Sequence, residues 1–296
     1  MLYCMNFQDA RKIIKMYQED ITPEKLNDAY KAWDLNCDLN SQDFFGKIDD
    51  YFLSHLGGWI FHTFYLKDWA MCWVWSLGTE LLERTLSDWM LPFRECWFDS
   101  FIIDLILSNL VGMYIGFSIM KWLNVDQHDW FGRRGKKSIS EWTIFHSHYK
   151  IAAFISSFFL SNIQFLTTFC GANALNFRVC DKTIQITRSS IWVIAGILAN
   201  KENHDFGEMD PLLSNESQGE FRWLLFTIAF LESLITFKFY EHSVFDPGML
   251  VVPLPYTVVW IIIIGGLVGL WIYLRYFKRA ELKKLKSLEE NKKKSK

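Results

Sequence analysis

The feature that most constrains the fold is a pair of long stretches without a charged residue. Ile151–Phe177 is a run of 27 such residues, and Met249–Leu274 is a run of 26. About 20 consecutive apolar residues are enough for a helix to cross the hydrocarbon core of a bilayer. Inside that core every backbone N–H and C=O must be satisfied within the protein, which a helix achieves by itself. We therefore predict an all-α fold, a polytopic bundle of transmembrane helices.

The other apolar segments divide the chain into three parts. Tyr51–Leu66 is apolar and aromatic, but it is short and interrupted by Gly57-Gly58, which favours a re-entrant or interfacial helix. The predicted parts are a polar, mostly helical segment (1–50), a transmembrane domain (51–275) and a basic tail (276–296). About six spans are expected in the second part, at 67–87, 101–122, 150–175, 184–200, 222–240 and 250–275.

The net charge of −2 conceals strongly charged ends and loops. Residues 1–50 have a balance of −4 and residues 201–220 one of −5, and we expect the latter to form a flexible loop. The tail 276–296 carries +6, and the loop 123–149 contains a basic cluster. By the positive-inside rule both face the cytosol, so the connection 88–100 faces the opposite side. A basic tail beside a span favours anionic lipid headgroups over nucleic acid as its partner.

The two ends and the cysteines carry weaker signals. Lys293-Lys294-Ser295-Lys296 matches the dilysine retrieval pattern of endoplasmic-reticulum membrane proteins, although a solvated basic end is an equal alternative. The N-terminus has no basic stretch followed by an apolar one, so no cleavable signal is expected. The six cysteines are scattered without a CxxC pair and indicate neither a zinc site nor a redox motif.

Acidic side chains lie inside the first two expected spans. Glu80 and Glu83 are three residues apart and share a helical face, while Asp104 and Asn109, in the next span, align only approximately. A charge at bilayer depth costs about 2.5–3.5 kcal/mol, so such groups are expected to be paired, to bind a cation or to line a wet cavity. The short connection predicts antiparallel neighbours whose acids meet near the non-cytosolic surface. Oxygen ligands without cysteine suit Ca²⁺, Mg²⁺ or Mn²⁺.

The connection between these spans adds Glu95 and Asp99. Taken alone, each is expected to be a solvated loop acid. A plain ion pair of Arg84 or Arg94 with one of the glutamates is an alternative to a metal site. No Walker A, GxSxG or HExxH motif is present, nor the DG…AR…G…D signature of CDP-alcohol phosphatidyltransferases.

The motifs around these acids follow a recognisable order. FLSHLGGW contains His55, TELLE contains Glu80 and Glu83, LPFRECWFD contains Glu95 and Asp99, and DLILSN contains Asp104 and Asn109. Asn36-Cys37 lies upstream, and His128-Asp129-Trp130 and an FLE…KF stretch with Glu232 lie downstream. This order resembles the base-exchange phosphatidylserine synthase family, strongly over about residues 36–130, thinly over 140–220 and fairly over 222–275.

The resemblance implies an integral enzyme of the endoplasmic reticulum that exchanges the head group of phosphatidylcholine or phosphatidylethanolamine for L-serine with Ca²⁺. His55 would be the general base on the serine hydroxyl. Since one phosphodiester alcohol replaces another, no nucleotide cofactor is needed. A homodimer and the identity of the donor lipid are left open. The resemblance assigns Ca²⁺ to Glu80, Glu83, Asp104 and Asn109, and substrate binding to Glu95, Asp99 and Glu232.

The chain also departs from the family pattern. Family members have further spans ahead of the region that matches residue 1. A Glu-Leu-Asn motif is replaced by Gln164-Phe165-Leu166, and a Pro-Thr-x-Arg stretch is replaced around Asn200-Lys201-Glu202-Asn203. Two alternatives therefore stay open: a non-catalytic or weakly active homologue that partners or regulates a synthase, and a cation transporter.

Overall fold

The computed structural model describes residues 40–48, 50–87, 95–174, 182–208, 219–239 and 254–278, and the single positions 6, 8, 9, 12, 37 and 93. These residues form helices and connections, and no strand occurs among them. The all-α class is confirmed for this part of the chain. Most of the N-terminal segment and of the basic tail lies outside the described residues.

In chain order the elements are α3 (Ser41–Gly46), α4 (Asp50–Leu66), α5 (Trp69–Leu86), the π-helix η3 (Asp99–Leu110), α6 (Val111–Trp122), the 3₁₀ turns η4 (Ile139–Glu141) and η5 (Thr143–Phe145), α7 (His148–Ala174), α8 (Lys182–Glu208), α9 (Glu220–Phe239), α10 (Leu254–Ile272) and the π-helix η8 (Tyr273–Lys278).

Each of the six expected spans coincides with a helix or with two helices joined end to end. Within the described residues, two continuous stretches, Asp99–Trp122 and Leu254–Phe277, are long and apolar enough to cross a membrane. The count of six spans stays a prediction.

The outer face of α10 is apolar and exposed. Val258, Ile261, Ile262 and Val268 on this helix keep 40–66% of their surface uncovered by the rest of the described chain. Soluble monomers rarely expose contiguous apolar patches of this kind. The acyl chains of a bilayer would cover this face at no cost, in line with the predicted last span.

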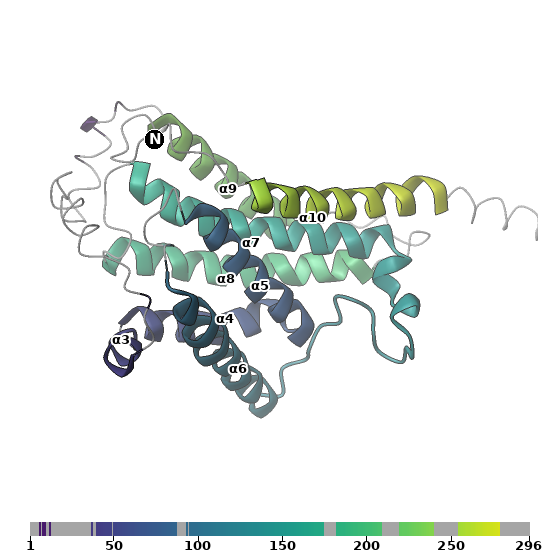
Figure 1. Cartoon of the computed structure of the whole chain (residues 1–296). Coiled ribbons are helices and arrows are strands. Elements are labelled where there is room, and N and C mark those ends of the chain that lie inside the picture. The colour runs from purple at the N-terminus through teal and green to yellow at the C-terminus, as the bar shows by residue number, and fades with distance from the viewer. Residues whose placement is uncertain are drawn as a thin grey trace, which may run out of the picture.

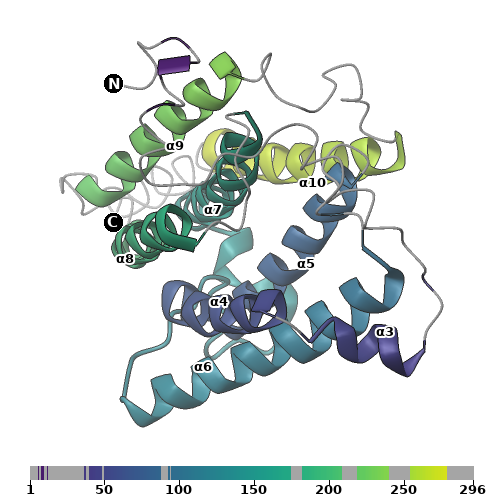
Figure 2. The same cartoon turned by 90° about the vertical axis from the view of Figure 1, so that its left-hand side faces the viewer.

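The helices form two groups that meet along α4. α4 packs against α6, η3 and α5, and also against α8 of the second group. α7, α8 and α9 pack on one another, and α10 contacts α7 and α5. Both views place α4 and α6 on the opposite side of the bundle from α9 and α10 (Figures 1 and 2).

The segment expected to form a re-entrant or interfacial helix is α4, and its placement in the membrane stays a prediction. It is one continuous helix of 17 residues that runs through Gly57-Gly58 without a break. Two glycines of α6 explain its close fit. A Cβ on Gly112 would lie 2.8 Å from the Leu56 carbonyl oxygen, and a Cβ on Gly116 would lie 2.0 Å from Thr63 Oγ1. Glycines four apart let helix backbones approach closely in membranes, and here they seat α6 on α4.

α4 and α5 form a helical hairpin, and Asp68 lies in the connection between them. Its contacts hold this end of the hairpin in place. Its Oδ1 accepts hydrogen bonds from the backbone N–H groups of Ala70 and Met71, and so caps α5. Arg133 Nη2 donates to both Asp68 oxygens at 2.8 and 2.9 Å, and the N–H of Trp130 donates to Oδ2 at 3.3 Å. The basic loop is thereby attached to the start of α5.

α8 extends further than expected, because the same loop binds its last turns. The ring of His204 stacks on His128 at 4.0 Å, and its Nε2 accepts the N–H of Asp129 at 3.3 Å. Burial, together with the charge of His204, lowers the pKa of His128 to about 3. Lys150 pairs with Glu208 at the helix end. Residues 201–208 are therefore helical, not part of a flexible loop.

We predict that Gly116→Leu lowers the unfolding temperature of the detergent-solubilised protein, because the new side chain collides with Thr63. Overpacking of this kind costs about 1–3 kcal/mol. The matched control is Gly58→Ala, since a Cβ at Gly58 meets nothing within 4 Å. Equal unfolding temperatures for the two variants, measured by intrinsic tryptophan fluorescence, would contradict the close contact of α4 with α6.

Candidate active site

α5 and η3 place a group of acids where they face each other. Glu80 and Glu83 lie in the last turns of α5, and Asp104 lies in η3, which packs on both α5 and α4. Glu83 and Asp104 are buried, with 7% and 8% of their surface exposed. The charges of Glu80, Glu95 and Asp104 act on one another. The predicted meeting of these acids is therefore present in the structure.

The π-helical form of η3 places three polar residues on one side. In an α-helix a step of five residues ends about 140° beyond a full turn, which would separate Asp104 from Asn109. Hydrogen bonds in a π-helix close from i to i+5, so its wider turn brings such residues back toward each other. Asp99, Asp104 and Asn109 are spaced by five, and all three are buried. The sequence aligned Asp104 and Asn109 only approximately, whereas in the structure they lie with Asp99 on one buried side of η3.

Asn109 connects this side to α5. Its Nδ2 donates to Ser76 Oγ at 2.9 Å and to Glu80 Oε1 at 3.3 Å. The other oxygen of Glu80, Oε2, is buried and has no hydrogen-bond partner among the described residues. An acceptor of this kind is costly to bury alone, so it indicates a missing donor or cation.

Glu95 and Asp99 are not the solvated loop acids that we expected. Asp99 is 6% exposed and begins η3, and its Oδ2 lies 2.7 Å from Lys47 Nζ. Glu95 accepts a hydrogen bond from Ser100 Oγ at 3.1 Å. Burial, together with repulsion from Asp104 and Asp99, raises the pKa of Glu95 to about 8. Both acids belong to the cluster.

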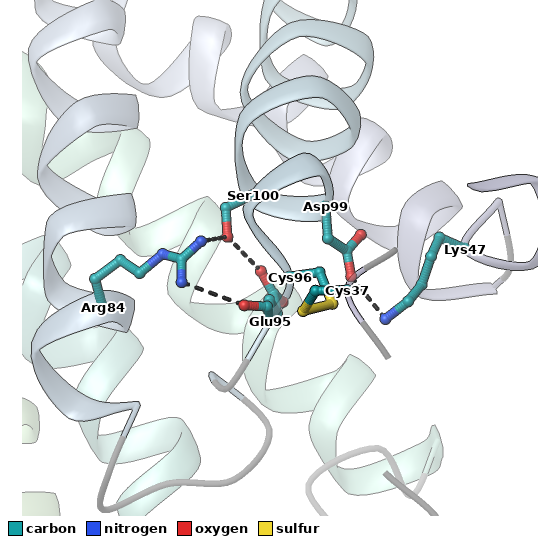
Figure 3. The surroundings of a disulfide bond; sticks show 7 residues. All are labelled: Cys37, Lys47, Arg84, Glu95, Cys96, Asp99 and Ser100. Carbon is teal, nitrogen blue, oxygen red and sulfur yellow. Dashed lines mark hydrogen bonds and ion pairs between the residues drawn. A yellow bond between two sulfur atoms is a disulfide. The ribbon is translucent and has the colours of Figure 1, made fainter. Parts of the chain in front are cut away.

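Arg84 does not neutralise the cluster through the ion pair considered above. Its guanidinium donates to the carbonyl oxygen of Glu95 at 3.2 Å and to Ser100 Oγ at 2.9 Å (Figure 3). Arg94, the other candidate, lies outside the described residues. The carboxylates near Glu80 thus outnumber the cations that contact them in the described part of the chain.

His55 lies beside the acids, as the resemblance implies. It projects from α4, and its Nδ1 is 3.8 Å from Oδ1 of Asp104. About a third of its side chain (32%) is exposed. A carboxylate at this nitrogen orients the ring and favours the tautomer with the proton on Nδ1. The other nitrogen, Nε2, is then an acceptor.

The cluster is not a finished metal centre. Within the described residues, no three acidic, histidine or cysteine side chains converge as metal ligands do. The main contacts of the helix that carries Glu232, those of α9 with α7 and α8, do not place this residue at the acids. Its assignment stays a prediction.

A disulfide and a lysine are the features that the sequence interpretation missed. Cys37 is bonded to Cys96, which is buried directly after Glu95, and Lys47 pairs with Asp99 (Figure 3). The cysteines were interpreted as a weak signal without a zinc or redox motif, and this pairing was not predicted. Two cysteines adjacent to motif residues, Asn36 and Glu95, were the available signal.

Comparison with known proteins agrees with this arrangement. The family model described as phosphatidyl serine synthase matches residues 1–240. The chain belongs to the phosphatidylserine synthase family. It is 29% identical to phosphatidylserine synthase 2 of Rattus norvegicus over 79% of the chain and 52% of that protein. It is 28% identical to the Homo sapiens protein of the same name, over 79% of the chain and 50% of that protein.

Plant members of the phosphatidylserine synthase family have a different name. The chain is 25% identical to CDP-diacylglycerol--serine O-phosphatidyltransferase 2 of Oryza sativa subsp. japonica, over 90% of the chain and 66% of that protein. The animal and plant names both include serine, but only the plant name states a phosphatidyl donor, CDP-diacylglycerol. The chain spans about half the length of the animal relatives it matches.

The segment that departs from the family pattern has structural contacts of its own. Asn200 and Asn203 accept hydrogen bonds from Ser157 Oγ and Ser156 Oγ of α7 at 2.6 and 3.1 Å. The carboxylate of Glu202 accepts the first backbone N–H groups of α9. These residues therefore join α7, α8 and α9. The side chains of Gln164-Phe165-Leu166 lie outside the described part of the chain.

We predict that Asn109→Leu destabilises the protein, because Glu80 Oε1 and Ser76 Oγ lose the donor that Asn109 supplies. Leaving a buried acceptor unsatisfied costs about 1–3 kcal/mol. The unfolding temperature in detergent should fall, while Ser118→Ala, which removes only an exposed hydrogen bond to Tyr114, should leave it unchanged. An Asn109→Leu protein as stable as the wild type would show that this hydrogen bond network contributes nothing.

Proposed function

We propose that the chain is the catalytic membrane portion of a phosphatidylserine synthase that exchanges the head group of phosphatidylcholine or phosphatidylethanolamine for L-serine with Ca²⁺. The observation that carries the proposal is the group formed by the half-buried Glu80 and the buried Glu83 and Asp104 beside His55. Membership of the family supports the substrate class.

The donor set fits a hard divalent cation. The groups are carboxylate and amide oxygens, which Ca²⁺ prefers, and Glu80 Oε2 is a buried acceptor without a partner among the described residues. Glu80, Glu83, Asp104 and Asn109 would hold the ion. When bound, Ca²⁺ would offset the negative charge of the phosphodiester and its transition state.

His55 would take the proton of the serine hydroxyl. Asp104 lies on the Nδ1 side of the ring, so Nε2 is the nitrogen that accepts this proton. The same nitrogen returns the proton to the departing choline or ethanolamine oxygen, which leaves His55 unchanged after one exchange. Asp104 would stabilise the charged ring between the two transfers.

The serine ammonium group requires a carboxylate that is not already paired. Asp99 has Lys47 as its partner, so we assign this contact to Glu95. A membrane of the endoplasmic reticulum, with the basic tail on the cytosolic side and the acids near the other surface, completes the proposal. The dilysine end of the tail and the basic loop 123–149 support this placement.

We predict that membranes containing the chain incorporate labelled serine into lipid and lose this activity when Ca²⁺ is chelated. His55→Ala and Glu80→Gln should each lower the rate by about 100-fold or more, because they remove the base and a cation ligand. Asp126→Asn, at an exposed acid, is the matched control and should retain the wild-type rate. Wild-type rates in both site variants would exclude this site, and no incorporation by well-folded wild-type protein would exclude the activity.

The names of the plant relatives suggest a second donor, CDP-diacylglycerol. In purified protein reconstituted with one donor at a time, we expect serine incorporation with phosphatidylcholine or phosphatidylethanolamine and release of choline or ethanolamine in equal amount. With CDP-diacylglycerol we expect none, in line with the missing DG…AR…G…D signature. Release of CMP in proportion to incorporated serine would reverse the choice of donor.

A further inference from the structure

Residues 37–47 are attached to the acidic corner, residues 95–100, at two points. Cys37 forms a disulfide with Cys96, which lies 59 positions further along the chain. Lys47 Nζ lies 2.7 Å from Oδ2 of the buried Asp99. Figure 3 shows both links on one side of the corner and Arg84 on the other.

Together these contacts define the position of Glu95. The disulfide anchors the residue that follows Glu95, and Arg84 binds the carbonyl oxygen of Glu95 itself. Ser100 Oγ, which also accepts from Arg84, donates to the Glu95 carboxylate. The carboxyl of Glu95 so held is within hydrogen-bonding reach of Asp104. Links from two distant segments thus determine where this acid points.

We propose that residues 37–47 form a redox-dependent brace that positions Glu95 at the acidic cluster. Cys37 and Lys47 are positioning residues in this view, since neither contacts the substrate. The proposal rests on the proposed function for the chemistry of the cluster, but the brace itself is defined by the disulfide and the ion pair.

Reduction would open the brace by ordinary thiol–disulfide exchange. A dithiol passes two electrons and two protons to the Cys37–Cys96 bond, which becomes two thiols, while the dithiol closes to its own disulfide. The corner is then tied to residues 37–47 by the Lys47–Asp99 pair alone. Because supporting residues of this kind change metal affinity 10–100-fold, we expect the affinity of the cluster for a divalent cation to fall about tenfold.

The disulfide of the brace also indicates on which side of the membrane these residues lie. Disulfides persist in oxidising compartments such as the lumen of the endoplasmic reticulum. Cys37 and Cys96 therefore lie on the non-cytosolic side, where the charge pattern places the connection 88–100. The other end of α4 adjoins the basic loop, since the carbonyl oxygen of Lys67 accepts the N–H of His128 at 2.8 Å. α4, about 26 Å long by its 17 residues, then crosses the bilayer as a further span.

The first test uses the full chain in detergent. Mass spectrometry of unreduced protein should recover peptides joined at Cys37 and Cys96, and free thiols at both positions would overturn the proposal. The Ca²⁺ concentration for half-maximal thermal stabilisation should rise about tenfold in Cys37→Ser and in Cys96→Ser. The double variant should show no further rise, because both changes remove the same bond. Cys72→Ala, at the buried free cysteine, should match the wild type.

Reduction should reproduce the effect of the variants. Dithiothreitol should raise the half-saturating Ca²⁺ concentration of the wild type about tenfold and leave that of Cys37→Ser unchanged. Equal responses of the two proteins would contradict a role for this bond. In sealed vesicles, a charged phosphine reductant should free the two thiols only after permeabilisation. Reduction without permeabilisation would place the brace on the cytosolic side and overturn the added span.

Variants of Lys47 distinguish a role in positioning Glu95 from an effect on the overall stability of the protein. Lys47→Gln should raise the half-saturating Ca²⁺ concentration, Lys47→Arg should restore it, and exposed Lys136→Gln should have no effect. No difference between Lys47→Gln and wild type would remove Lys47 from the brace. If the wild type neither bound Ca²⁺ nor incorporated serine, the proposed function would fail. The disulfide map and a dithiol-dependent unfolding temperature absent in Cys37→Ser would then still decide whether the brace exists.

Discussion

The repulsion among buried carboxylates is the constraint on which the rest of the structure depends. Glu83, Asp99 and Asp104 are almost fully buried, and Glu80 and Glu95 lie beside them. At an effective dielectric constant of about 20, two unit charges 4 Å apart interact with about 4 kcal/mol. Such a cluster survives in a folded chain only where neighbouring elements hold it together, and where protons or cations reduce its charge.

Those neighbouring elements are joined at both ends of the α4–α5 hairpin. At one end, Asp68 binds the basic loop through Arg133. At the other, the acidic corner is bonded to Cys37 and Lys47. Between these ends, the glycines of α6 let α4 approach closely enough to carry His55 to Asp104. The arrangement of His55 and the acids is therefore a product of contacts that lie outside it.

The sequence predicted what depends on local composition. Charge-free runs located the helices, and helical spacing identified Glu80 and Glu83 as neighbours, since both signals are written in adjacent residues. It did not predict that Asp99 shares a buried side of η3 with Asp104 and Asn109. A π-helical turn differs from an α-helical one through its hydrogen bonds, which local composition does not reveal. Nor did it predict the Cys37–Cys96 pair, because a pairing over 59 positions depends on the tertiary fold.

The end of α8 shows a second limit of local composition. Residues 201–208 are rich in charge and lack an apolar face, which favours a loop. They are helical because His204, Glu208 and Asn203 each bind another element. Tertiary contacts of polar groups outweigh local propensity there.

Offsetting the charge of a phosphate and discriminating between donors require different groups in the protein. A cation held by carboxylates can offset the charge of any phosphodiester or diphosphate, so such a cluster would suit a phospholipid donor and CDP-diacylglycerol alike. Discrimination must come from groups that contact the departing head group. Residues 200–203 differ from the family pattern, yet their side chains bind α7 and α9 instead of forming an open site. In this chain the residues at these positions serve helix packing, and the acidic cluster lies on other elements, α5 and η3.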